Sequence, residues 1–179
     1  MPIILFAAWF LIAVAVATSE LLKLAHPAVV PAIIGTLLVL LLVAWRRLDA
    51  VRKLIARVDV RVLVALHIVR APIGLAFLWF HSRGLLPADF AMRGGIGDIV
   101  AGLLALVVVV VPRPRWLAAW NIIGLLDLVM VVITAQRHIL FGDPTVMAPL
   151  VDFPFAMLPL FVVPLMLGTH VMLFTRFRG

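Results

Sequence analysis

The sequence predicts an all-α integral membrane protein, a bundle of six transmembrane helices with both termini in the cytoplasm. Three observations support this fold class. Hydrophobic residues make up 66% of the 179 residues, charged residues make up 13%, and the mean hydropathy is +1.27, which lies outside the range of soluble domains. The apolar residues form six runs of roughly membrane-crossing length. Lys and Arg gather in alternate connections between those runs.

The composition also bounds the domain organisation and the partners. The longest polar segment, residues 46–59, is too short to bury a core of its own, so we expect a single membrane domain over residues 1–179. Cys is absent, which excludes disulfides, iron–sulfur clusters and covalently attached haem. The net charge of +7 follows from basic cytoplasmic segments, so we expect the lipid bilayer, and not nucleic acid, as the partner.

The first two spans, about 3–24 and 28–45, are Leu-, Val- and Ala-rich, and the second has no ionisable group in its interior. After them, residues 46–59 place Arg and Lys among apolar residues that recur every three or four positions. This pattern predicts a short basic amphipathic helix on the anionic cytoplasmic leaflet.

The third span, about 60–82, is an apolar run that nevertheless carries His67, Arg70 and His81. At 3.6 residues per turn these three side chains and Gly74 share one helix face. Ionisable groups inside a membrane are costly. We therefore expect this face to contact protein, water or a cofactor instead of lipid.

The fourth span, about 95–112, begins GIGDIVAGLLAL, with Gly95, Asp98 and Gly102 on one side. Small residues at this spacing let helix backbones approach closely. The glycines are therefore a candidate packing surface, either within the chain or in a homodimer.

The fifth span, about 116–138, contains Asn121 and Asp127 and ends at His138. The sixth, about 151–175, contains His170 and several prolines. Prolines in a membrane helix predict freed carbonyl groups that neighbouring side chains or water must satisfy.

The distribution of Lys and Arg predicts the orientation of these spans. One side holds ten such residues, at 46–61, 113–115 and 176–178, and the other side holds four, Lys23, Arg83, Arg93 and Arg137. By the positive-inside rule the richer side is cytoplasmic. Both termini are then cytoplasmic, and we expect a multi-pass protein of the cell membrane.

At a helical rise of about 1.5 Å per residue, the buried polar residues fall into groups of similar depth in the membrane. His67, Asn121 and His170 form a layer toward the cytoplasmic side, whereas Arg70 and Asp127 lie near the midplane. An arginine at the midplane requires a partner, so the sequence predicts an Arg70–Asp127 pair. The remaining groups, His81, Asp98 and His138, are expected toward the outer side.

His67 and His81 lie fourteen residues apart, or about 21 Å along one helix. This spacing resembles one ligand helix of cytochrome b subunits, which use such a pair on each of two helices; here a second helix with paired histidines is missing. The resemblance implies haem b, with the inner iron held by His67 and His170. It implies an outer iron held by His81 with His138 or His26, and electron transfer with membrane quinone.

Other interpretations of the same polar residues remain open. A metal site with mixed nitrogen and oxygen ligands would combine His81, Asp98 and Glu20 with His138 or Asp152. A small-solute or proton-linked transporter or channel would use a pathway through Arg70, Asp98, Asn121 and Asp127. An accessory or assembly subunit of a larger membrane complex would need these groups only to lock helices together. The sequence leaves open whether the chain is an enzyme.

Overall fold

The computed structural model describes residues 2–19 and 21–177, and in these ranges the chain is helical and has no strand. Five of the described helical runs are long and apolar enough to cross a membrane: Val29–Arg47, Val60–Ser82, Ala88–Val110, Pro114–Phe141 and Leu158–Arg176. A further apolar helix, α1 (Pro2–Ala17), has 16 residues. The predicted all-helical architecture is therefore confirmed for the described residues, and five of its helical runs are long and apolar enough to span a membrane.

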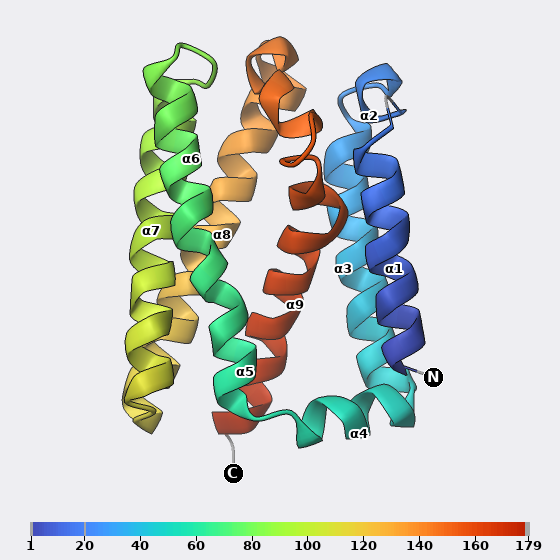
Figure 1. Cartoon of the computed structure of the whole chain (residues 1–179), viewed down its shortest axis with the longest axis vertical. Coiled ribbons are helices and arrows are strands. Elements are labelled where there is room, and N and C mark those ends of the chain that lie inside the picture. The colour runs from blue at the N-terminus through green and yellow to red at the C-terminus, as the bar shows by residue number, and fades with distance from the viewer. Residues whose placement is uncertain (1, 20, 178–179) are drawn as a thin grey trace.

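The long helices stand side by side in three groups (Figure 1). The pair α1 and α3 (Val29–Arg47) lies on one side, and α9 (Val163–Leu173) lies in the middle and contacts α3 and α8. The other side is formed by α6, α7 and α8, with α7 packed along both neighbours. Their bounds are Arg70–Ser82, Ala88–Val110 and Pro114–Phe141.

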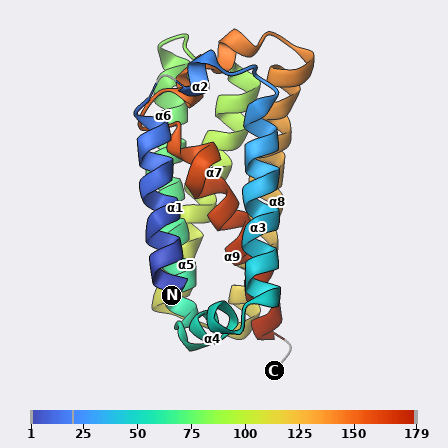
Figure 2. The ribbon, with the colours of Figure 1, turned by 90° about the vertical axis from the view of Figure 1, so that its right-hand side faces the viewer.

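The two ends of the bundle differ in their connections (Figures 1 and 2). The amphipathic helix α4 (Asp49–Arg57) lies across the end where both chain termini are found. It falls within the predicted segment 46–59, although α3 extends to Arg47. We call this the α4 end. The opposite end, the α2 end, carries the short helix α2 (Leu21–Leu24) and η2 (Pro144–Val151), a 3₁₀ segment.

The third predicted span is one helical run, α5 (Val60–Ala65), η1 (Leu66–Val69) and α6, with a 3₁₀ segment in its middle. Pro72 explains the irregularity, because its ring has no N–H and excludes the carbonyl of residue 68 from a regular helical bond. The irregular segment η1 contains His67 and ends immediately before Arg70. His67 and Arg70 therefore lie where the helix is interrupted, whereas His81 lies in the last turn of α6.

Three helix boundaries differ from the prediction by seven residues each. The helix predicted from residue 95 begins at Ala88, because Phe90 is buried and Asp89 pairs with α8. The helix predicted from residue 151 begins at Leu158, with η3 (Leu158–Val162), a turn of π-helix, before α9. The first helix ends at Ala17 instead of continuing to residue 24. Apolar turns and apolar helices look alike in sequence, which explains these differences.

Pro164 illustrates how this fold satisfies freed carbonyl groups, as the prolines of the last span predict. Its ring excludes the carbonyl of Leu160 from a regular helical hydrogen bond. The indole of Trp9 in α1 donates to this carbonyl oxygen at 2.9 Å. The interrupted helix thereby gains a bond that ties α1 to the centre of the bundle.

Candidate functional site

Arg70 is the largest fully buried side chain of the described residues, with 1% of its surface exposed. Its Nε donates to Asp98 Oδ1 at 2.7 Å, its Nη1 donates to the carbonyl of Gly124 at 2.9 Å, and its Nη2 donates to Asp127 Oδ2. Arg70 comes from α6, Asp98 from α7, and Gly124 and Asp127 from α8. We call Arg70, Asp98 and Asp127 the Arg70 cluster.

The structure thus brings Arg70 and Asp127 together, as their depth predicts, and adds Asp98 from a third helix. Asp98 is expected from the sequence near the outer surface, beside His81, and this expectation is wrong. Because α7 begins at Ala88, Asp98 lies ten residues inside the helix, at the depth of Arg70.

Two glycines make room for the Arg70 cluster. A Cβ added at Gly97 would stand 1.7 Å from Asp127 Oδ1, so only a glycine lets this carboxylate reach across α7. A Cβ at Gly124 would stand 2.9 Å from the His170 ring and 3.4 Å from Arg70 Nη1. Gly95 and Gly102, which are predicted as a close-packing surface, are buried against α6 and so serve packing within the chain and do not face outward.

The charges of the Arg70 cluster do not balance. One guanidinium faces two carboxylates, so the cluster carries one net negative charge when both carboxylates are ionised. A buried uncompensated charge is costly in a medium of low dielectric constant. The cluster can therefore bind one unit of positive charge, either a proton on a carboxylate or a cation beside it.

His67, Asn121 and His170, predicted at a common depth, also meet. The centroids of the two imidazole rings are 4.2 Å apart, and both histidines are fully buried. We call His67 and His170 the histidine pair. It lies next to the Arg70 cluster, because a Cβ added at Gly124 would meet both the His170 ring and Arg70 Nη1.

The hydrogen bonds around the histidine pair determine which ring nitrogen carries the proton. The Thr169 hydroxyl donates to the Met166 carbonyl, so it accepts from His67 Nε2 at 2.9 Å. The Asn121 amide donates to the His170 carbonyl, so its oxygen accepts from His170 Nδ1 at 2.8 Å. The other nitrogens, His67 Nδ1 and His170 Nε2, are buried and have no hydrogen-bond partner.

The prediction of a haem held by His67 and His170 stays a prediction, and the described geometry does not favour it. A haem iron with two axial histidines places the porphyrin between the two rings. Here the rings touch each other at a tilt of 51°, and both also lie against Trp120. This arrangement has no space for a porphyrin between the two rings.

The two outer histidines have separate partners. His81 Nδ1 donates to the Leu86 carbonyl at 3.0 Å within the α6–α7 connection. His138 Nε2 bonds Asp89 Oδ1 at 2.9 Å, and Arg137 bonds the other oxygen of the same carboxylate. The outer pairing of His81 with His138 is therefore not formed.

The ligands considered for a mixed metal site are likewise dispersed. Asp98 belongs to the Arg70 cluster, and Asp152 pairs with Lys23 at 2.6 Å. Glu20 lies outside the described residues. Among residues 2–19 and 21–177, no three His, Asp or Glu side chains are grouped as metal ligands.

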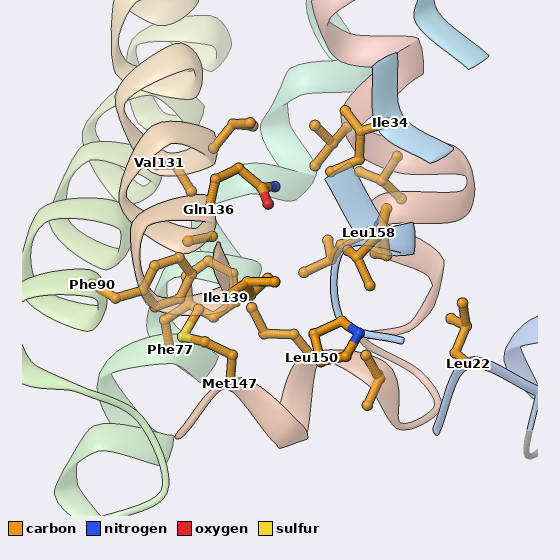
Figure 3. A pocket seen from close by; sticks show the side chains of 18 of the residues that line it. Leu22, Ile34, Phe77, Phe90, Val131, Gln136, Ile139, Met147, Leu150 and Leu158 are labelled. Atoms are coloured by element: carbon orange, nitrogen blue, oxygen red, sulfur yellow. The ribbon is translucent and has the colours of Figure 1, made fainter. Parts of the chain in front are cut away.

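A cavity of about 250 Å³ connects the α2 end with the Arg70 cluster. Its lining residues Lys23 and Thr145 are exposed and mark its mouth, and Arg70 and Asp98 are buried and mark its inner limit. The walls between them are almost entirely apolar and come from α3, α6, α8, η2 and the η3–α9 run (Figure 3). Below the histidine pair, toward the α4 end, the bundle is closed by an apolar cluster of Leu63, Val64, Ala105, Val108, Leu117, Trp120 and Leu173.

Sequence reasoning missed the cavity, the role of Thr169 and the side chain of Gln136, which lines the cavity from α8. A single glutamine inside the fifth apolar span was the available signal for Gln136. No comparable signal existed for the cavity, because its apolar lining has the same composition as lipid-facing surface.

Comparison with known proteins gives a family without an assigned activity. A family model described as a domain of unknown function (DUF8737) matches residues 27–178. Neither the curated proteins nor the solved structures include a match to the chain. The matched region contains the whole Arg70 cluster and the histidine pair, and it covers most of the sequence; the chain therefore belongs to the DUF8737 family.

Proposed function

We propose that this chain is a proton-linked transporter of a small, mostly apolar molecule that carries one positive charge. The observation that carries the proposal is the cavity, which is apolar along its walls and reaches a buried cluster of one guanidinium and two carboxylates. Apolar walls favour the body of such a molecule, and the excess carboxylate favours its charged group. A proton and the cation then compete for the same negative charge.

Two further features support transport in addition to binding. The cavity is open toward the α2 end and is followed by an apolar layer toward the α4 end, as expected for a site with access from one side at a time. The helical runs beside the cluster are interrupted, by the 3₁₀ segment η1 and the π-turn η3. Interrupted helices near the midplane are a recurring feature of transporter binding sites.

The proposal includes a membrane topology. We infer one membrane domain in the cell membrane with six crossings, in which α1 is the sixth and the α4 end is cytoplasmic. Helix α1 is about 24 Å long, shorter than a hydrocarbon core of about 30 Å. Local thinning of the bilayer accommodates such a mismatch at modest cost.

Binding is tested with n-octylammonium and with octan-1-ol, a neutral molecule of similar size, using protein in lipid nanodiscs and isothermal titration calorimetry. Octylammonium is expected to bind and to release up to one proton, which calorimetry in buffers of different ionisation enthalpy measures. Octan-1-ol is expected to bind without proton release. Asp98→Asn should lose octylammonium binding and keep octan-1-ol binding, since only the charge is removed.

Asp143→Asn is the matched control. Asp143 is fully exposed at the α2 end and does not line the cavity, and hydrogen bonds from Thr145 lower the pKa of its carboxyl, so it is ionised at neutral pH. Asparagine keeps the side-chain oxygen that accepts from Thr145 at the cavity mouth. This variant should behave like the wild type. Unchanged octylammonium binding in Asp98→Asn, or binding without proton release, would contradict the proposed competition.

Transport is tested in proteoliposomes with n-octyltrimethylammonium, which cannot cross the bilayer as a neutral base. A proton gradient is expected to accelerate its uptake in wild-type liposomes and to have no effect with Asp98→Asn. Wild-type uptake equal to that of empty liposomes would overturn the transport part of the proposal.

A further inference from the structure

Gln136 is the one amide side chain among the residues that line the cavity. The other polar lining residues are Lys23 and Thr145 at the mouth and Arg70 and Asp98 at the inner limit. Gln136 therefore provides a polar group partway along walls that are otherwise apolar.

The amide oxygen of Gln136 is buried and has no hydrogen-bond partner. Buried polar atoms in folded proteins nearly always have a partner, so an orphaned acceptor at a cavity wall indicates a group that completes it. Figure 3 shows the Gln136 side chain extending from α8 toward Ile34 and Leu158 on the opposite wall. Gln136 thus lies at the cavity wall with its oxygen covered, and a rotation of the terminal amide presents that oxygen to a molecule in the cavity.

The position of Gln136 along α8 sets a length. Leu128, next to Asp127 of the Arg70 cluster, lines the cavity eight residues before Gln136. Eight residues correspond to about 12 Å along a helix. A molecule whose charged end lies at the Arg70 cluster therefore presents atoms about 12 Å from that end to Gln136.

We propose that Gln136 accepts a hydrogen bond from a second polar group of the ligand, which makes the ligand class an elongated amine with a hydroxyl or N–H group about 12 Å from its charge. Only the charged end of this ligand rests on the proposed function. The hydrogen bond at Gln136 is available to a neutral molecule as well, because it does not involve the Arg70 cluster.

The test compares hydroxyl and methoxy ligands, since a hydroxyl group donates a hydrogen bond and a methyl ether only accepts one. One pair is 8-aminooctan-1-ol and 8-methoxyoctylamine; the neutral pair is octan-1-ol and 1-methoxyoctane. Wild-type protein in nanodiscs is expected to bind the hydroxyl member of each pair about fivefold more tightly, the size of one net hydrogen bond. Gln136→Leu, which keeps the side chain's approximate size, should bind both members of a pair equally.

Equal affinities within both pairs in the wild type would overturn the inference, because water would then satisfy Gln136 as well as a ligand does. Failure of both amines to bind, with a Gln136-dependent preference retained in the neutral pair, would contradict the proposed function and leave the role of Gln136 supported. If Gln136→Leu still bound the hydroxyl ligand more tightly than the methoxy ligand, another group would be responsible for the preference. This result would also overturn the inference.

Discussion

At the scale of single residues, Arg70 holds three helices together by its charge and its hydrogen-bond geometry. A guanidinium has five N–H donors in a fixed plane, and three of them engage groups from α7 and α8. Such a buried cluster adds little net stability over an apolar replacement, yet removing one member is costly. The proposed role of the cluster in binding one positive charge therefore explains its presence better than its contribution to stability does.

Arg70→Met should lower the free energy of unfolding by about 3–5 kcal/mol, because two carboxylates would remain buried without a counter-charge. Unfolding in mixed micelles of increasing SDS content measures the change. The triple variant Arg70→Met, Asp98→Asn, Asp127→Asn removes every charge of the cluster and should recover a large part of the loss. A single variant as stable as the wild type would show that the carboxylates do not depend on Arg70.

How far the sequence predicts the site is clearest at this scale. Equal depth identifies the partners of Arg70 and His67, because residues at one level of parallel helices can meet. The same reasoning fails for Asp98, because depth is counted from the start of the helix and that start is placed seven residues too late. The error in this one helix boundary therefore places Asp98 at the periphery of the predicted site, whereas it lies at the centre of the observed one.

At the scale of helices, the contact between α6 and α7 depends on glycines. A Cβ at Gly74 would stand 2.3 Å from the carbonyl oxygen of Gly95, and a Cβ at Gly102 would stand 2.6 Å from the backbone nitrogen of Ala71. These obstacles are backbone atoms, which cannot turn aside as a side chain can. Close approach of α6 and α7 in turn brings Arg70 within reach of Asp98.

Gly74→Ala should therefore separate α6 from α7 and lower the free energy of unfolding by about 1–3 kcal/mol, the usual cost of overpacking. Gly35→Ala is the matched control, because a Cβ at Gly35 in α3 meets no atom within 4 Å. This control is expected to cause no loss, since Ala is the better helix former. Equal stability of the two variants, measured by SDS-induced unfolding, would refute the role given to Gly74.

The sequence predicts the interiors of the helices better than their ends. Long apolar runs and the small-residue pattern of α7 indicate which segments are helical and which surface packs closely. By contrast, residues 151–157 are as apolar as a span, yet they form turns and part of η2 before Leu158. Hydrophobicity alone does not separate these states, because both are buried in apolar surroundings.

At the scale of the whole molecule, the cavity is a property of the arrangement and not of any one segment. Its lining combines residues from both sides of the bundle, brought together around α9 (Figure 1). Most of these residues are aliphatic, so periodicity cannot distinguish them from residues that face lipid. The predicted orientation, in contrast, depends only on the numbers of Lys and Arg residues on the two sides, which are counted directly from the sequence.

The proposed topology can be tested directly because the chain has no Cys. Single cysteines at Ile3, Arg52 and Arg83, all exposed, report on the start of α1, on α4 and on the α2 end. In intact cells a membrane-impermeant maleimide should label Arg83→Cys alone, and permeabilised cells should allow labelling of all three. The positive-inside rule places the six basic residues of 46–61 in the cytoplasm, and six crossings return Ile3 to that side. Labelling of Ile3→Cys together with Arg83→Cys would mean that α1 does not cross. Labelling of Ile3→Cys and Arg52→Cys without Arg83→Cys would mean that the molecule is inverted and that its cavity opens to the cytoplasm.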